Sequence, residues 1–129
     1  MALASVLVVD GDRDALAATR AALGAGDYAV HEAPNGRRAL ESIRSDPPDV
    51  LITEVLMPEG DGIELITAVR GPYPDLRIIA VSDRRFLGEL DLLNMARLLG
   101  ADAALDKPLG AETLLGTIAG LLASGAPEG

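Results

Sequence analysis

The stretch Ser5–Asp12 reads SVLVVDGD, a run of apolar, mostly β-branched residues that ends in two acidic ones. Three later stretches have the same form, an apolar run with a polar residue at its end: VLITE at 50–54, LRIIAVS at 76–82 and AALDK at 103–107. Nearly continuous apolar runs are typical of strands buried on both faces of a parallel sheet. Ligands lie beyond the carboxyl ends of such strands. We therefore expect one pocket to contain Asp10, Asp12, Glu54, Ser82 and Lys107.

Strand-like and helix-like segments alternate along the whole chain. The predicted strands are Ser5–Val9, Tyr28–Glu32, Val50–Thr53, Leu76–Val81 and Ala103–Leu105, and the second is polar enough for a sheet edge. The predicted helices are Arg13–Leu23, Arg37–Arg44, Ile63–Val69, Leu87–Leu99 and Ala111–Leu122. Expected helix ends are a capping box at Asp61 and Glu64, a cap at Asn35 and closure at Gly100. Five βα units predict an open α/β fold, a doubly wound sheet with right-handed crossovers.

Length and charge narrow the function classes. A chain of 129 residues fits one domain, which we place at residues 1–123, with 124–129 as a tail, the start of a linker or an expression remnant. The net charge of −9 argues against binding nucleic acid or anionic membranes. The chain has no cysteine, and no run is long enough to span a bilayer. We expect a cytoplasmic protein whose partner is a protein or a small ligand.

Five motifs in order resemble the receiver domain of two-component response regulators over essentially the whole chain. They are VLVVDGD at 6–12, YAVHEAPNGRRALE at 28–41, PDVLITEVLMPEGDG at 48–62, IIAVS ending at Ser82, and LGADAALDKP ending at Lys107 and Pro108. The resemblance implies a flavodoxin-like (βα)5 fold with strand order 2-1-3-4-5. It also implies a phosphorelay in which an aspartate takes a phosphoryl group from a phosphohistidine, with help from Mg²⁺ and a lysine.

The implied magnesium site departs from the family pattern. Asp10 matches the first acid, but Gly11 stands where a second, metal-binding acid is expected. Asp12 is either a substitute ligand or simply the cap of the first helix. With Glu54 and the main chain of Leu56, Asp10 and Asp12 are the remaining candidates for Mg²⁺. We therefore assign no firm cofactor and expect any Mg²⁺ binding to be weak.

Glu54 stands at the phosphoacceptor position, where the family has an aspartate. The extra methylene lengthens the side chain by about 1.5 Å, and a 1 Å misplacement can cost about a hundredfold in rate. One interpretation is that Glu54 reaches toward Lys107 and places negative charge where an aspartyl phosphate would lie. Another is that Glu54 has drifted in a disused pocket. A third is that phosphorylation still occurs, by an unusual route through Glu54 or Asp12.

Three other positions correspond to residues that act in the phosphorylation-dependent switch of the family. Lys107 precedes Pro108, a pair that in the family usually has a cis peptide aiming the lysine into the pocket; the lysine also balances Asp10 and Glu54. Ser82 fits the hydroxyl role of the family, or ordinary turn chemistry. Ala104 replaces the aromatic switch residue of many receivers. Together with Gly11 and Glu54, it favours a pseudo-receiver that acts by protein–protein interaction and is not an enzyme.

The segment Asp83–Leu99 is about three residues longer than the resemblance leads us to expect. Its apolar residues are spread too widely around a helix to face one sheet: Leu90, Leu92, Leu93, Met95, Leu98 and Leu99. Either some are exposed at an interface or a tilted helix covers a wider core. Candidate partners are a histidine kinase, a phosphotransfer protein, a downstream signalling protein, or a second copy bound through this segment. His31, the only histidine, is assigned to the surface without a catalytic role.

One alternative comes from another class. The DGD at 10–12 also resembles the nucleophile and acid of haloacid-dehalogenase-like phosphatases, with Ser82 and Lys107 in matching roles at strand ends. Asp14 stands where that motif has a threonine, no acidic pair follows Lys107, and there is no cap insertion. The phosphatase interpretation also leaves the Met57-Pro58 segment unexplained.

Overall fold

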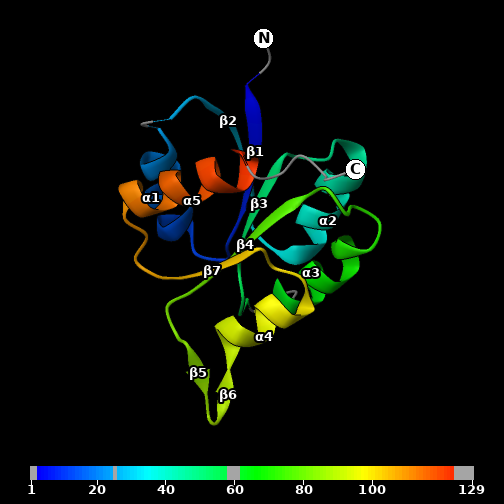
Figure 1. The fold of residues 1–129 in the computed structure, drawn as a ribbon, viewed down its shortest axis with the longest axis vertical. Helices are drawn as coiled ribbons and strands as arrows, with labels where there is room; N and C mark the ends of the chain where they lie inside the picture. The colour runs from blue at the N-terminus through cyan, green and yellow to red at the C-terminus, as the bar shows by residue number, and fades with distance from the viewer. Residues whose placement is uncertain (1–2, 25, 58–61, 124–129) are drawn as a thin grey trace.

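The structure is a computed structural model that describes residues 3–24, 26–57 and 62–123. Its strands are β1 (Ala4–Val9), β2 (Tyr28–Ala33), β3 (Val50–Glu54), β4 (Arg77–Ser82), β5 (Phe86–Leu87), β6 (Leu90–Asp91) and β7 (Ala103–Asp106). Its helices are α1 (Arg13–Leu23), α2 (Gly36–Ser45), α3 (Gly62–Arg70), α4 (Leu92–Leu99) and α5 (Ala111–Ala123). Figure 1 shows a central sheet with helices on both faces.

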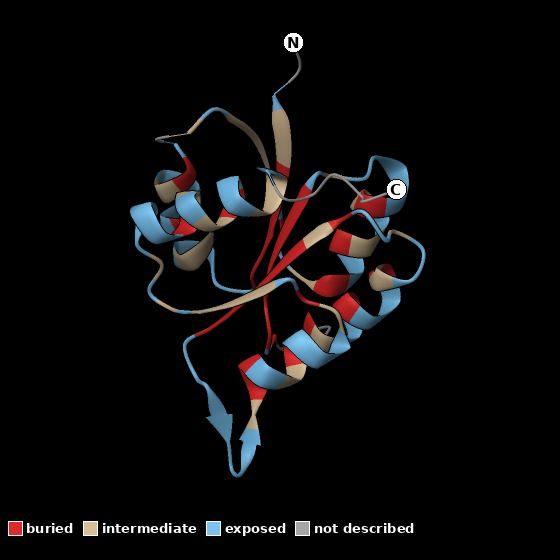
Figure 2. Cartoon of the chain, viewed as in Figure 1, coloured by how far each residue is buried: buried red, intermediate tan, exposed pale blue. Residues whose placement is uncertain are grey.

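The sheet has five parallel strands in the order β2-β1-β3-β4-β7. This order confirms the predicted flavodoxin-like, doubly wound fold. Helices α1 and α5 pack together on one face, while α2, α3 and α4 cover the other (Figure 1). The more polar β2 lies at an edge, as predicted, and the central β3 is buried along its whole length (Figure 2).

Alternating side chains divide the interior into two cores. On the α1/α5 face, Leu114 and Ile118 of α5 pack with apolar residues of three strands, β1, β3 and β4: Val6, Val8, Val50, Ile52, Ile79 and Val81. On the opposite face, residues of the same strands pack against α2, α3 and α4. Full burial of one such side chain contributes about 1.5–3 kcal/mol. The strands are therefore held from both faces, which gives their carboxyl ends a rigid frame.

Most of the helix ends follow the sequence prediction. Asn35 caps α2, its side-chain oxygen accepting from the Arg38 N–H at 2.9 Å. Asp12 caps α1 by accepting from the Asp14 N–H at 2.9 Å. Gly100 ends α4 with φ at 132°, a conformation that favours glycine. The expected capping box involves Asp61, which lies outside the described residues.

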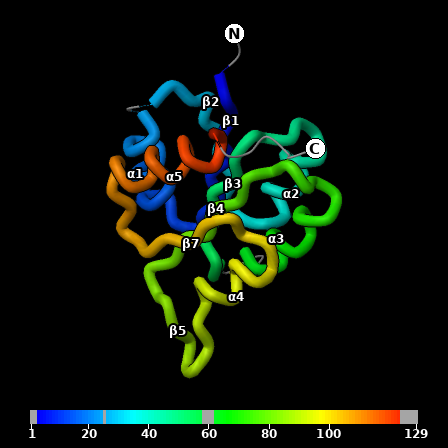
Figure 3. The backbone as a smooth tube through the Cα atoms, viewed as in Figure 1, coloured from blue at the N-terminus to red at the C-terminus, as the bar shows by residue number. Residues whose placement is uncertain are grey.

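The predicted helix Leu87–Leu99 is wrong in its first part. α4 begins only at Leu92, and the preceding residues form a hairpin in which Phe86 lies opposite Asp91 and Leu87 opposite Leu90. Gly88 turns the hairpin with φ at 62°, as type II′ turns require. Asp91 then starts α4 by accepting from the Asn94 N–H at 3.1 Å. The extra length of this segment is therefore a hairpin, which extends away from the body (Figure 3).

Gly62 is required at the start of α3 because it touches the backbone of β3. A Cβ atom at this position would lie 1.8 Å from the Glu54 carbonyl oxygen, and the Gly62 N–H donates to the Val55 carbonyl at 3.0 Å. We predict that Gly62→Ala lowers the free energy of unfolding by about 3 kcal/mol. The measurement is chemical denaturation followed by circular dichroism.

The matched control for Gly62 is Gly116 in the middle of α5, where an added Cβ would meet nothing within 4 Å. Gly116→Ala should stabilise the protein by about 0.5–1 kcal/mol through helix propensity. Equal effects of the two substitutions would contradict the close contact assigned to Gly62.

Candidate functional site

The ends of four strands build the site. Asp10 directly follows β1, Glu54 ends β3, Ser82 ends β4 and Lys107 directly follows β7. Main-chain hydrogen bonds keep these ends in register: the Val55 N–H donates to the Val81 carbonyl and the Lys107 N–H to the Ser82 carbonyl, both at 2.9 Å. Residues 97 positions apart in sequence, Asp10 and Lys107, are thereby brought into direct contact.

At the centre of the site, the Lys107 ammonium lies between two carboxylates. Lys107 Nζ is 2.6 Å from Glu54 Oε2, and it also donates a short hydrogen bond to Asp10 Oδ2. Asp10 and Glu54 are only 6% and 5% exposed, so water solvates both carboxylates poorly. One cation faces two anions, which leaves a formal charge of −1 in the site if all three are ionised.

The pKa values of Glu54 and Lys107 reflect this arrangement. Burial raises the pKa of Glu54 above its ordinary value of 4.5; Lys107 pulls it down, while the charges of Asp10 and Asp83 push it further up. Burial alone would lower the pKa of Lys107, but its bonds to Asp10 and Glu54 outweigh burial and raise it. Lys107 therefore stays charged near neutral pH, whereas burial makes the charged form of Glu54 costly.

The residues present do not fit a magnesium ion. Gly11 supplies no carboxylate, and the Asp12 carboxylate caps α1. The two oxygens of Asp10 are already engaged, one by Lys107 and the other by the Asp12 N–H at 2.9 Å. Across residues 3–24, 26–57 and 62–123, no three acidic, histidine or cysteine side chains are grouped as metal ligands. Leu56 follows β3 two residues after Glu54, and it is exposed.

The switch positions have local partners. The buried Ser82 hydroxyl donates to the Arg84 carbonyl at 2.7 Å and accepts from the Arg84 N–H at 3.2 Å. These two bonds form a local turn at the end of β4. Ala104 is half-buried in β7 and packs against the core on the α2–α4 face. The Lys107-Pro108 peptide is cis, the geometry that the family resemblance implies. Met57 is buried, and Pro58 lies outside the described residues.

Sequence reasoning missed the part played by Asp83. Its charge acts on Glu54, and it lines a cavity of about 340 Å³ together with Lys107, the α1 cap Asp12 and the α1 residues Ala15, Ala18 and Thr19. The signal in the sequence was its position directly after Ser82, which ends β4. His31 is exposed, as expected.

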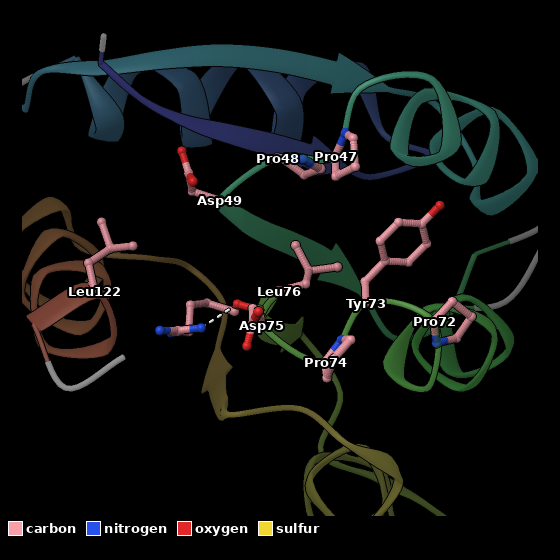
Figure 4. Close-up of a pocket in the computed structure, with 10 residues that line it drawn as sticks. Pro47, Pro48, Asp49, Pro72, Tyr73, Pro74, Asp75, Leu76 and Leu122 are labelled. Carbon is pink, nitrogen blue, oxygen red and sulfur yellow. Dashed lines mark hydrogen bonds between the residues drawn. The ribbon is translucent and has the colours of Figure 1, made fainter. Parts of the chain in front are cut away.

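A second cavity lies at the amino-terminal ends of the strands, away from the charged cluster. Its volume is about 560 Å³, and four prolines form much of its lining, with Tyr73, Asp49 and Leu122 among the others (Figure 4). The Asp49 carboxylate in its lining accepts from the Ser5 N–H at 2.8 Å. Arg77 is likewise engaged, donating from Nε to the Leu121 carbonyl at 3.2 Å. These bonds join Asp49 to β1 and Arg77 of β4 to α5, so both charged side chains hold secondary-structure elements together.

Comparison with known proteins identifies the class. The sequence profile of the response regulator receiver domain matches residues 6–119. Together with the fold and the position of the acidic and basic residues at the strand ends, this match shows that the chain belongs to the response regulator receiver domain family. Within residues 3–24, 26–57 and 62–123, no helix has the length and apolar character needed to cross a membrane.

The similar proteins come from several organisms. The response regulator MprA of Mycobacterium tuberculosis strain H37Rv is 39% identical over 124 residues, which are 95% of this chain and 52% of MprA. The chain therefore spans about half the length of the curated relatives it matches. Among solved structures, a CheY-like receiver domain protein from Methanospirillum hungatei JF-1 has a TM-score of 0.88 at 26% identity, covering 99% of this chain and 100% of its own. Chemotaxis protein CheY4 of Vibrio cholerae has a TM-score of 0.80 at 32% identity, covering 92% and 98%.

Removing the central cation should be costly. Lys107→Met would leave Asp10 and Glu54 buried without a counter-ion, and we predict a loss of about 3–5 kcal/mol in the free energy of unfolding at pH 7. The loss should shrink as the pH falls and the carboxylates take up protons. The exposed Arg20–Glu32 pair provides the control, because Arg20→Met should cost less than about 1 kcal/mol. Chemical denaturation at pH 7 and pH 4 measures both.

The raised pKa of Glu54 predicts the sign of a pH effect. A carboxyl whose pKa is higher in the folded state than in the unfolded state stabilises the fold when protonated, and this contribution is lost as the pH rises through the folded pKa. Relative to the wild type, Glu54→Gln should therefore gain stability as the pH rises from about 4.5 toward 8, a window in which Lys107 stays charged. Denaturation curves across this range test the difference, and a constant difference would contradict it.

Proposed function

We propose that this chain is a pseudo-receiver, a signalling module in a two-component or phosphorelay pathway that works without phosphorylation of its own. In this proposal the Glu54 carboxylate permanently occupies the place beside Lys107 that an aspartyl phosphate takes in a working receiver. The observation that carries it is the 2.6 Å contact between Lys107 Nζ and Glu54 Oε2 at a buried site. The module would then be held in one signalling state.

The chemistry of phosphoryl transfer supports this proposal at three points. The nucleophile must be free to attack, whereas Glu54 is paired with the only lysine in the chain. A divalent cation must offset the phosphoryl charge, whereas Gly11 supplies no ligand and Asp12 caps α1. The product must be read by a switch, whereas Ala104 has no ring to move and the Ser82 hydroxyl is bonded to Arg84.

The partners that we propose are proteins of the same pathway: a histidine kinase, a phosphotransfer protein or a downstream signalling protein in the cytoplasm. Apolar side chains are exposed on the segment between β4 and β7, with Phe86 55%, Leu98 78% and Leu99 38% exposed. Several exposed apolar side chains on one segment favour a protein interface.

We also propose that the chain is not an enzyme. In the phosphatase alternative, Asp12 would be the acid, but its carboxylate serves here as a helix cap.

A phosphodonor experiment tests the proposal. The protein is incubated with acetyl phosphate and Mg²⁺, and intact mass spectrometry follows the addition of one phosphoryl group. We expect none on the wild type. The double variant Gly11→Asp with Glu54→Asp restores the family's nucleophile and second acid, and it should acquire a hydroxylamine-sensitive acyl phosphate.

Two outcomes would count against the proposal. An acyl phosphate mapped to Glu54 of the wild type would make the protein a working receiver. Hydrolysis of a generic phosphomonoester by the wild type, lost in Asp10→Asn, would instead support the phosphatase alternative. The double variant is the positive control for the first assay, since it shows that the donor reaches the pocket.

A further inference from the structure

A buried hydroxyl without a partner lies in the cavity beside Lys107. Thr19 of α1 is only 7% exposed and lines this cavity of about 340 Å³. No residue in the described parts of the chain forms a hydrogen bond with its side chain. The helical residues Thr67 and Thr117, in contrast, each donate to the carbonyl four residues earlier. Buried polar groups are nearly always hydrogen-bonded, so the Thr19 hydroxyl is available to a molecule that enters the cavity.

The charges around the cavity favour a cation. The Asp83 carboxylate forms no hydrogen bond or ion pair with any residue that the structure describes. The Asp12 carboxylate uses one oxygen to cap α1, and its other oxygen has no partner among the same residues. Lys107 also lines the cavity, but its charge already faces Asp10 and Glu54, which do not. The cavity is therefore negative, and it should attract cations and repel anions.

The rest of the lining is apolar, which favours an organic cation over a metal ion. It consists of Ala15 and Ala18 from α1 and of Pro108 and Leu109 from the segment between β7 and α5. Within the described residues, no three side chains of the kinds that bind metals are grouped together. The volume is near the lower end of the range for small-molecule sites, which begins at about 300 Å³. An ammonium group on a short carbon chain matches both parts of this lining.

We infer that this cavity binds a primary aliphatic amine of about four to six carbon atoms. An ammonium group has three N–H donors, and the cavity offers three acceptors for them: the carboxylates of Asp12 and Asp83 and the hydroxyl oxygen of Thr19. The carbon chain packs against the four apolar residues. This inference goes beyond the proposed function, because the cavity does not include Glu54 and binding requires no phosphoryl group. So small a ligand binds modestly, with Kd on the order of 0.1–1 mM.

An amide NMR titration of the whole chain with 1-aminopentane tests the inference. The signals of Thr19, Asp83 and Leu109 should shift and saturate. Two probes of similar size isolate the part played by charge. 1-Pentanol is neutral and butanoate is negative, and each should bind at least tenfold more weakly than the amine.

Substitutions in α1 provide a matched pair. Ala18→Leu places a larger side chain in the cavity and should raise Kd for 1-aminopentane at least tenfold. Ala17→Leu introduces the same side chain at an exposed neighbour that does not line the cavity, and it should change Kd less than twofold.

Two further variants remove single acceptors. Asp83→Asn should raise Kd at least fivefold, whereas Glu41→Gln on the exposed side of α2 should leave it unchanged. Thr19→Val replaces the hydroxyl with a methyl group of the same shape and should raise Kd at least threefold. It should not lower the melting temperature, because the hydroxyl has no protein partner to lose.

Three results would overturn the inference. The first is a wild type whose spectrum shows no saturable shift with 1-aminopentane at concentrations on the order of 10 mM. The second is equal binding of 1-pentanol, which would make the cavity a purely apolar site. The third is a response of the same signals to Mg²⁺ but not to the amine, which would make it a metal site.

Discussion

The site depends on one electrostatic constraint, the placement of a single half-buried ammonium between two buried carboxylates. Lys107 holds Asp10 and Glu54 at the carboxyl edge of the sheet, where water is largely excluded. Each carboxylate would be costly to ionise there alone, and the two would repel each other. The cation therefore ties β1, β3 and the end of β7 into one unit, while burial keeps the pKa of Glu54 raised.

The same constraint bears on function. In phosphoryl transfer, the lysine and a metal ion neutralise charge that appears during the reaction. In this chain, Lys107 is already paired with the Glu54 carboxylate. Position 11, where an acidic residue would hold the metal, is a glycine. The positive charge of Lys107 is thus already neutralised by carboxylates in the resting protein. In the function that we propose, the module acts through its surface, and the hairpin and α4 carry exposed apolar side chains.

Much of the fold was predictable because it rests on local patterns. Continuous apolar runs predicted the buried strands β1, β3 and β4, and the alternation with helices led to the parallel sheet that the structure has. The segment 87–91 was wrongly predicted as helical because its leucines also satisfy helical spacing. The signals against a helix were present, a glycine directly after the apolar pair Phe86-Leu87 and an aspartate as a cap, but they are short, and the helical period that follows outweighed them.

The sequence by itself determined the class of fold, the set of polar residues at the strand ends and the substitution at position 54, because each depends on residue type and spacing along the chain. Only the tertiary structure decided which of those polar residues touch. Asp10 and Glu54 both contact Lys107. Asp12 instead caps α1, and the Ser82 hydroxyl bonds the Arg84 main chain in the turn that follows β4. Such choices depend on distances between segments far apart in sequence, and those distances are set by how the strands pack in the sheet.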